Sequence, residues 1–204
     1  TAEGLAWMLG LCPPLIHFAG LVFTEIPAAL LVAAGLRSAA FARRGRGPVI
    51  AALCAAALPW FNVRYGILSV AIAAALVVRV GRGEEGGRRL VSRARFLLAP
   101  GLVALASALA LCVFHYSLWG FFDPRRVYGR SREFSLSILP EGLPGLFFDQ
   151  EFGLFIYAPV YALAFVGAGA LWRRHRAVAL GAALAVVGVV LTASVWPMWR
   201  GGFN

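Results

Sequence analysis

The chain has 204 residues, of which 61% are hydrophobic and 14% charged, and its formal net charge is +10. Soluble domains average roughly 45–50% apolar and about 25% charged residues. This composition excludes a disordered chain, a nucleic-acid-binding tail and an ordinary cytosolic enzyme. Long apolar runs are typical of helices that cross a bilayer, so the sequence predicts an all-α, polytopic membrane helical bundle.

About seven apolar segments follow one another along the chain. A spanning helix needs about 20 residues. The third and fourth segments are shorter than this, and only the turn Asn62-Val63 separates them. We expect this pair to form a short, re-entrant-like hairpin whose tip lines a cavity. The predicted segments are 5–16, 23–41, 48–61, 64–80, 96–116, 153–172 and 177–196.

The connections between these segments alternate in charge. All 19 basic residues are arginine, and 13 of them lie in one set of connections, whereas the other set carries as many acidic residues as arginines. The positive-inside rule places the arginine-rich set in the cytoplasm and the long loop 117–152 outside it. Because membrane topology accounts for the positive charge, no nucleic-acid partner is expected. The absence of lysine suggests a GC-rich bacterial genome, and hence a multi-pass protein of the bacterial cytoplasmic (inner) membrane.

The sequence predicts one transmembrane domain, 1–204, that is an internal fragment of a longer chain. It starts at Thr1 without a methionine and stops directly after an apolar segment. The three cysteines lie inside apolar runs without metal-ligand spacing, so we expect them to pack against neighbours and form no disulfide. They are Cys12, Cys54 and Cys112.

Polar residues at the outer ends of the segments are the candidates for function, because polar groups near membrane depth are costly. Glu25 follows Thr24, a candidate N-cap, and precedes Pro27. A carboxylate there lies at the positive end of a helix dipole. It either binds a divalent metal or acts as a base, or it merely completes the start of the helix. His17 either contacts substrate or is a wetted interface residue.

The hairpin turn carries a second group of candidates. Arg64 and Tyr65 follow the turn, and Trp60 is predicted to anchor it at the membrane interface. Arg64 is suited to a phosphate or pyrophosphate. The alternative is an arginine that extends to the interface beside Tyr65.

Two further groups lie farther along the chain. The loop region that begins at His115 contains aromatic, glycine and charged residues, which suit sugar hydroxyls and lipid phosphates. An ordinary solvated loop is the alternative, in which acidic residues satisfy the next helix N-terminus. The second group follows Pro197, where a diglycine permits close backbone approach to a ligand. The candidates from the two groups are Arg125, Arg126, Asp149, Glu151, Trp199 and Arg200.

These stretches resemble bacterial polytopic glycosyltransferases of the GT-C fold, of the mannosyltransferase or arabinosyltransferase kind that use polyprenyl-phosphate sugars. Three stretches carry the resemblance, together with the later Trp199-Arg200-Gly201-Gly202. They are Cys12-Pro13-Pro14-Leu15-Ile16-His17 through Phe23-Thr24-Glu25-Ile26-Pro27, then Leu58-Pro59-Trp60-Phe61-Asn62-Val63-Arg64-Tyr65, then Phe148-Asp149-Gln150-Glu151-Phe152-Gly153 through Pro159.

The resemblance implies a membrane glycosyltransferase that moves sugar from a polyprenyl-phosphate donor to a glycan, lipid or protein acceptor on the extracytoplasmic face. It implies a catalytic Asp in an outer loop upstream of Thr1, and assistance by a divalent metal, Mg or Mn. Glu25 matches a second acidic position that helps form the metal or phosphate site in some members. Asn62 stands where relatives often carry His. Arg64 is a candidate for the lipid phosphate.

A non-enzymatic membrane protein is the alternative, either a transporter or flippase for a lipid-linked saccharide or an assembly partner. Ion-coupled transporters carry polar residues at the midplane of the membrane and internal repeats. Here the centres of the segments are Ala, Leu, Val and Gly, and the charges lie at the ends. This pattern argues against ion-coupled transport and leaves a structural role open.

Overall fold

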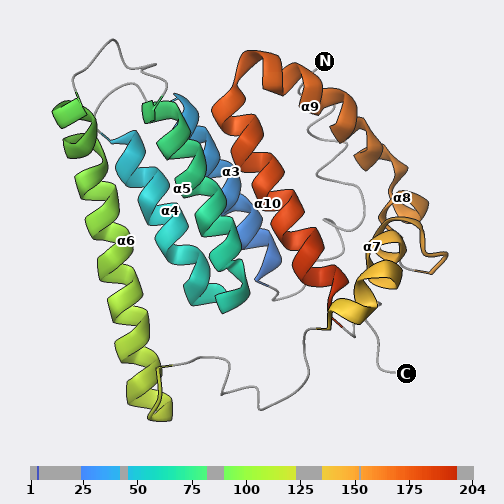
Figure 1. Cartoon of the computed structure of the whole chain (residues 1–204), viewed down its shortest axis with the longest axis horizontal. Helices are drawn as coiled ribbons and strands as arrows, with labels where there is room; N and C mark the ends of the chain where they lie inside the picture. Colours follow the sequence, from blue (N-terminus) through green and yellow to red (C-terminus); the bar gives the residue numbers. More distant parts are fainter. Residues whose placement is uncertain are drawn as a thin grey trace. The chain divides into compact units, whose positions relative to one another are not determined.

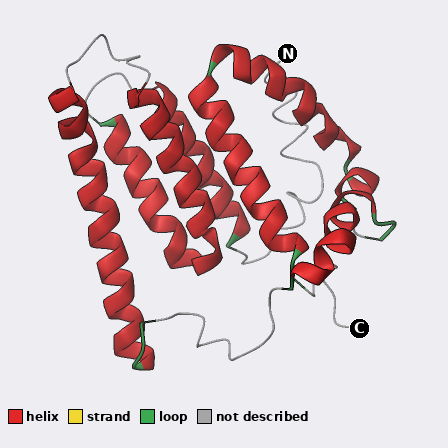
Figure 2. Ribbon diagram, viewed as in Figure 1, coloured by secondary structure: helices red, strands yellow, loops and turns green. Residues whose placement is uncertain are grey.

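The computed structural model describes residues 4, 24–41, 46–81, 90–122, 135–151 and 153–196. These residues form helices joined by short turns, and no strand occurs among them, which confirms the all-α prediction for this part of the chain (Figures 1 and 2). The helices are α3 (Glu25–Phe41), α4 (Gly47–Phe61), η1 (Val63–Tyr65), α5 (Gly66–Gly81), α6 (Leu90–Trp119), η3 (Leu136–Ile138), α7 (Leu139–Phe148), α8 (Leu154–Tyr157), η4 (Pro159–Ala162), α9 (Leu163–Arg174) and α10 (Arg176–Ser194).

The chain divides into two compact units, each described here by itself. The hairpin unit comprises Pro27–Ser131 and Leu171–Ala185, and therefore holds α3 to α6 and the first half of α10. The aromatic unit comprises Thr1–Ile26, Arg132–Ala170 and Val186–Asn204, which include α7 and α8.

Three helices of the described residues are long and apolar enough to cross a membrane. They are Val63–Gly81, Leu97–Trp119 and Arg176–Ser194, and Gly47–Phe61 is a shorter apolar helix. They correspond to the fourth, fifth, seventh and third predicted segments. The first predicted segment, 5–16, lies outside the described residues.

The sixth predicted segment, 153–172, is not one helix. It is divided into α8, η4 and α9 at Ala158, whose φ of −141° and ψ of 66° are not helical. Pro159 accounts for the break, because a proline disfavours the helical conformation of the residue before it. The hydropathy of this stretch was sufficient for a span, but its backbone is not continuous.

The predicted loop 117–152 is partly helical. At its start, α6 continues to Trp119 and ends at Gly120, which has a φ of 71° and donates its N–H to the Tyr116 carbonyl at 2.8 Å. This left-handed glycine cap is a common helix end. Later in the same stretch, α7 forms with a proline at its first turn, where a missing N–H is tolerated.

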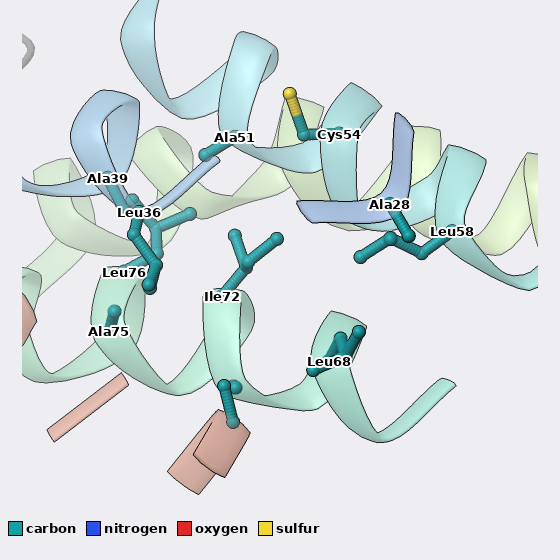
Figure 3. Packing of buried hydrophobic residues seen from close by; sticks show 12 residues of the cluster. Ala28, Leu36, Ala39, Ala51, Cys54, Leu58, Leu68, Ile72, Ala75 and Leu76 are labelled. Atoms are coloured by element: carbon teal, nitrogen blue, oxygen red, sulfur yellow. The ribbon is translucent and has the colours of Figure 1, made fainter. Parts of the chain in front are cut away.

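Helix α5 lies at the centre of the hairpin unit. Ile72 is 1% exposed and occupies the middle of a cluster to which α3, α4 and α10 also contribute (Figure 3). Helix α4 packs on α5 on one side and on α6 on the other (Figure 1). The buried cluster consists of Ala28, Leu36, Ala39, Ala51, Cys54, Leu58, Leu68, Ala71, Ile72, Ala75, Leu76 and Ala185.

Glycines allow the helices to approach α5 closely. A Cβ on Gly181 of α10 would lie 2.6 Å from Leu36 Cδ2 and 2.8 Å from Ala75 Cβ, and one on Gly35 of α3 would lie 2.6 Å from Ile72 Cδ1. Small residues at such positions favour helix association in bilayers, where dispersion contacts between helices replace hydrophobic driving force. Gly35 and Gly181 therefore serve helix contacts within the hairpin unit.

Candidate functional site

The tip of the hairpin between α4 and α5 is the best-defined of the predicted sites. Helix α4 ends at Asn62, where φ is −161° and ψ is 132°. The Asn62 side chain accepts a hydrogen bond from the Arg64 N–H at 3.0 Å, and the Asn62 carbonyl accepts one from the Tyr65 N–H at 2.9 Å. Asn62 therefore caps η1 in the way that short polar side chains cap helix starts. The tip holds Arg64 and Tyr65 half-buried next to this cap.

A serine on α5 compensates for the proline that precedes the tip. Pro59 lies inside α4 and has no N–H, so the Ala55 carbonyl lacks its usual helical donor. Ser69 Oγ donates to this carbonyl at 2.6 Å. The bond crosses from α5 to α4 and holds the two arms of the hairpin together.

A second serine joins the hairpin to α6. Ser107 Oγ donates to the Ala56 carbonyl at 3.0 Å and accepts a hydrogen bond from Trp60 Nε1 at 2.9 Å. Trp60 thus uses its indole N–H within the protein, while the residue as a whole is 46% exposed. The predicted interface anchor is also a contact between α4 and α6.

Aromatic side chains of α6 continue from Trp60. The ring of Phe114 lies 5.7 Å from that of Trp60, and His115 meets Phe114 edge-on at 6.1 Å. His115 Nδ1 is buried and has no hydrogen-bond partner among the described residues. We call this end of the unit, with Asn62, Arg64, Tyr65, Trp60 and the Phe114–His115 pair, the hairpin end.

The opposite end of the hairpin unit carries arginine and no described acid. Arg79 of α5 is 7% exposed, and its Nη1 donates to the Ala39 carbonyl in the last turn of α3 at 2.7 Å. A cation at a helix C-terminus is stabilised by the helix dipole. Five other arginines at this end, the arginine end, have exposed side chains. They are Arg37, Arg46, Arg173, Arg174 and Arg176.

Asp149 and Glu151 lie in the aromatic unit, in the turn between α7 and α8. Asp149 Oδ1 accepts a hydrogen bond from the Glu151 N–H at 2.8 Å, and the Asp149 carbonyl accepts one from the Gly153 N–H at 2.8 Å. This is an Asx turn, the conformation that aspartate side chains promote. The carboxylate of Asp149 shapes the turn, and the side chain of Glu151 is exposed.

The aromatic unit is held together by ring stacking and close backbone contact. Phe147 of α7 stacks on Phe155 of α8 with centroids 5.2 Å apart, and Phe165 lies 6.0 Å from Phe155. A Cβ on Gly142 would clash with the backbone carbonyl of Ser194, so α7 depends on glycine where it meets the end of α10. The segment predicted as loop is therefore a packed structure.

Glu25 is exposed in the first turn of α3, where the sequence placed it. Among the described residues, no three His, Cys, Asp or Glu side chains gather into a group that could hold a metal ion. Glu25 thus supplies at most one ligand of such a site, and the divalent metal stays a prediction. His17, Arg125, Arg126, Trp199 and Arg200 lie outside the described residues.

Three residues that the sequence analysis did not name contact the hairpin: Ser69 bonds to the Ala55 and Tyr65 carbonyls, and Ser107 and Phe114 contact Trp60. Ser69, Ser107 and Phe114 lie inside apolar runs, where a serine or an aromatic residue carries no signal of its own. One signal was available for Ser69, because Pro59 predicts an unpaired carbonyl four residues earlier on α4. Identifying the donor required knowing which helix lies alongside.

Compared with known protein families, curated proteins and solved structures, the chain matches none of them. Its functional interpretation therefore depends on the residues and geometry of the chain itself.

Proposed function

We propose that this chain belongs to a membrane glycosyltransferase that moves a sugar from a polyprenyl-phosphate donor to an acceptor on the extracytoplasmic face of a bacterial cytoplasmic membrane. The observation that carries the proposal is the hairpin end. There, a half-buried arginine and tyrosine lie beside a polar cap at one end of apolar helices. A donor with a long apolar tail and a phosphate head requires this combination of apolar and cationic surface.

The chemistry assigns distinct roles to the candidate residues. An acceptor hydroxyl attacks the anomeric carbon, the bond from this carbon to the phosphate oxygen breaks, and the hydroxyl proton passes to a base. Arg64 pairs with the phosphate and stabilises the charge that develops on it as it leaves. Tyr65 donates a hydrogen bond to the same group. Glu25 is the candidate base among the described residues.

Aromatic side chains at the hairpin end favour a sugar over a bare phosphate as the bound group. Trp60, with 46% of its surface exposed, offers an aromatic face next to Phe114. Aromatic rings bind the apolar C–H surfaces of sugars. The exposed arginines of the arginine end support an orientation with the hairpin end outside, because arginines between spans favour the cytoplasmic side.

Sugar transfer by membranes that contain the complete protein tests the proposal. Radiolabelled polyprenyl-phosphate sugars and divalent metal are supplied, and Glu25→Gln is compared with the unsubstituted protein. Transfer that is lost with Glu25→Gln assigns this carboxylate to the reaction. Transfer that survives the substitution would limit Glu25 to a role at the start of the helix and would still support a glycosyltransferase. Folded protein that transfers sugar from none of the donors contradicts the proposed function.

A further inference from the structure

A groove runs along the hairpin unit near its arginine end. Its floor is Ala51, Ala52 and Ala55 of α4, and α5 and α6 form its walls, with Val77 on one side and Gly101 on the other. Its volume is about 220 Å³, and every residue that lines it is apolar. The lining residues of α6 run from Leu97 to Ala104, which is about 10 Å along a helix axis.

Small residues keep this groove open. A Cβ on Gly101 would meet nothing within 4 Å, and Gly101, Ala104 and Val77 are exposed. Pro100, one residue before Gly101, is buried. An empty groove lined by alanine and glycine loses dispersion contacts along its whole surface. The groove therefore favours an apolar occupant that is narrower than a helix.

The charge around the groove selects the head group of that occupant. Arg46 precedes Ala51 by five residues, about 7.5 Å along α4, and its side chain is exposed. No acidic residue occurs among the described residues of the hairpin unit, 27–41, 46–81, 90–122 and 171–185, whereas five arginines are exposed at this end. The exposed Arg46 at the start of α4 is complementary to an anionic group and opposes a second copy of the chain packed on the groove in the same orientation, because like charges would meet.

We propose that the groove binds one acyl chain of an anionic phospholipid of the cytoplasmic leaflet, with the phosphate on Arg46. The chain fills the space over Ala51, Ala52 and Ala55, and the head group lies at the level where α4 begins. Arginine binds phosphate through paired N–H donors. This lipid site lies toward the arginine end, so it stands independently of sugar transfer at the hairpin end.

Native mass spectrometry of the purified full chain tests this site, with dioleoylphosphatidylglycerol and dioleoylphosphatidylcholine as probes. Gly101→Leu fills the groove, and Ala104→Leu fills it from a second position. We expect each variant to retain one phosphatidylglycerol fewer than the unsubstituted protein. Gly167→Leu of α9 is the matched control, because a Cβ there also meets nothing within 4 Å and Gly167 does not line the groove. It should retain lipid as the unsubstituted protein does.

The head-group assignment has its own pair of variants. Arg46→Gln should reduce the preference for phosphatidylglycerol over phosphatidylcholine by about fivefold, the equivalent of about 1 kcal/mol for one arginine near an anionic surface. Arg174→Gln removes the same charge at the end of α9 and should leave the preference unchanged.

Three results would overturn the proposal. The first is full lipid retention by both groove-filling variants. The second is an equal loss of preference in Arg46→Gln and Arg174→Gln, which would indicate diffuse attraction to the surface. The third is displacement of phosphatidylglycerol by another occupant, either a polyprenyl phosphate or a second copy of the chain, seen as a dimer that Gly101→Leu dissociates.

Discussion

The two ends of the hairpin unit both carry arginine, but they use it differently. At the hairpin end, Arg64 is half-buried, and its backbone N–H is capped by the side chain of Asn62. At the arginine end, Arg79 of α5 is buried and donates to the Ala39 carbonyl in the last turn of α3, and five more arginines are exposed. A charged residue among fixed polar neighbours suits a site, whereas a group of exposed like charges suits a membrane surface.

The difference shows why total charge says little about function in this chain. The net charge of +10 comes mainly from connections with many arginines. Arg64, the arginine for which we propose a role in donor binding, lies in the outer set of connections, whose arginines and acidic residues are equal in number. The position, burial and neighbours of an arginine distinguish a candidate binding residue from a surface residue, whereas the number of arginines does not.

The largest expected effect separates the two ends by activity. Arg64→Gln should lower sugar transfer by about 10- to 100-fold, because a hydrogen bond to a charged group is worth about 1.5–3 kcal/mol. Arg174→Gln at the other end should leave the rate unchanged. Initial rates of transfer in the same membranes measure both. Equal losses of transfer rate in the two variants would contradict a specific role for Arg64.

The packing of α10 against α3 and α5 is expected to be nearly as sensitive to substitution. Gly181→Leu places carbon atoms against Leu36 and Ala75, and overpacking of this kind costs about 1–3 kcal/mol. Gly101→Leu on α6 meets open space and should change the free energy of unfolding by less than about 0.5 kcal/mol. Reversible unfolding in lipid-free detergent micelles gives both values. Similar losses would mean that α10 does not pack on α5 as described.

Arg79 should matter for stability where the exposed arginines do not. Arg79→Gln weakens the hydrogen bond to the Ala39 carbonyl and removes a cation from a helix C-terminus, so we expect a loss of about 1–2 kcal/mol. Arg176→Gln, with an exposed side chain, should cost less than about 0.5 kcal/mol. The same unfolding experiment compares them. A neutral Arg79→Gln would place Arg79 among the surface arginines.

The smallest effect concerns the serine that compensates for Pro59. Ser69→Ala leaves the Ala55 carbonyl without its donor, and hydrogen bonds between membrane helices are worth about 1 kcal/mol. Ser117→Ala is the matched control, because Ser117 Oγ donates to Phe114 within its own helix. It should be close to neutral. If the two substitutions lower the free energy of unfolding equally, the hydrogen bond from Ser69 to the Ala55 carbonyl does not stabilise the hairpin more than a bond within one helix does.

Much of the helical architecture was predictable from hydropathy, and the exceptions have backbone causes. The segments that became α4, α5, α6 and α10 were located within a few residues. The segment 153–172 was not one helix, because Pro159 interrupts it, and hydropathy does not register a missing N–H. Helix α7 was not predicted from the sequence, because its apolar run is short and contains glycine and proline.

The candidate site was predictable only in part. The turn at Asn62-Val63 and its neighbours Arg64 and Tyr65 were identified from sequence, because tight turns and charges stand out among apolar residues. The contacts of Trp60 with Ser107 and Phe114 were not, since they join residues about 50 positions apart. Asp149 was ambiguous from sequence, and only the structure reveals its Asx turn.

The most direct test of this account is the sidedness of one helix. Val63 and Gly81 are the two ends of the candidate membrane span Val63–Gly81, which is about 28 Å long, close to the hydrocarbon thickness of a bilayer. Both residues are exposed. Val63→Cys and Gly81→Cys are each treated in intact cells with a membrane-impermeant maleimide, with the parent chain as the background control. We predict that Val63→Cys is labelled from outside and that Gly81→Cys is labelled only after the membrane is permeabilised. Labelling of Gly81→Cys in intact cells, or of both positions alike, would contradict the assignment of the hairpin end to the extracytoplasmic face.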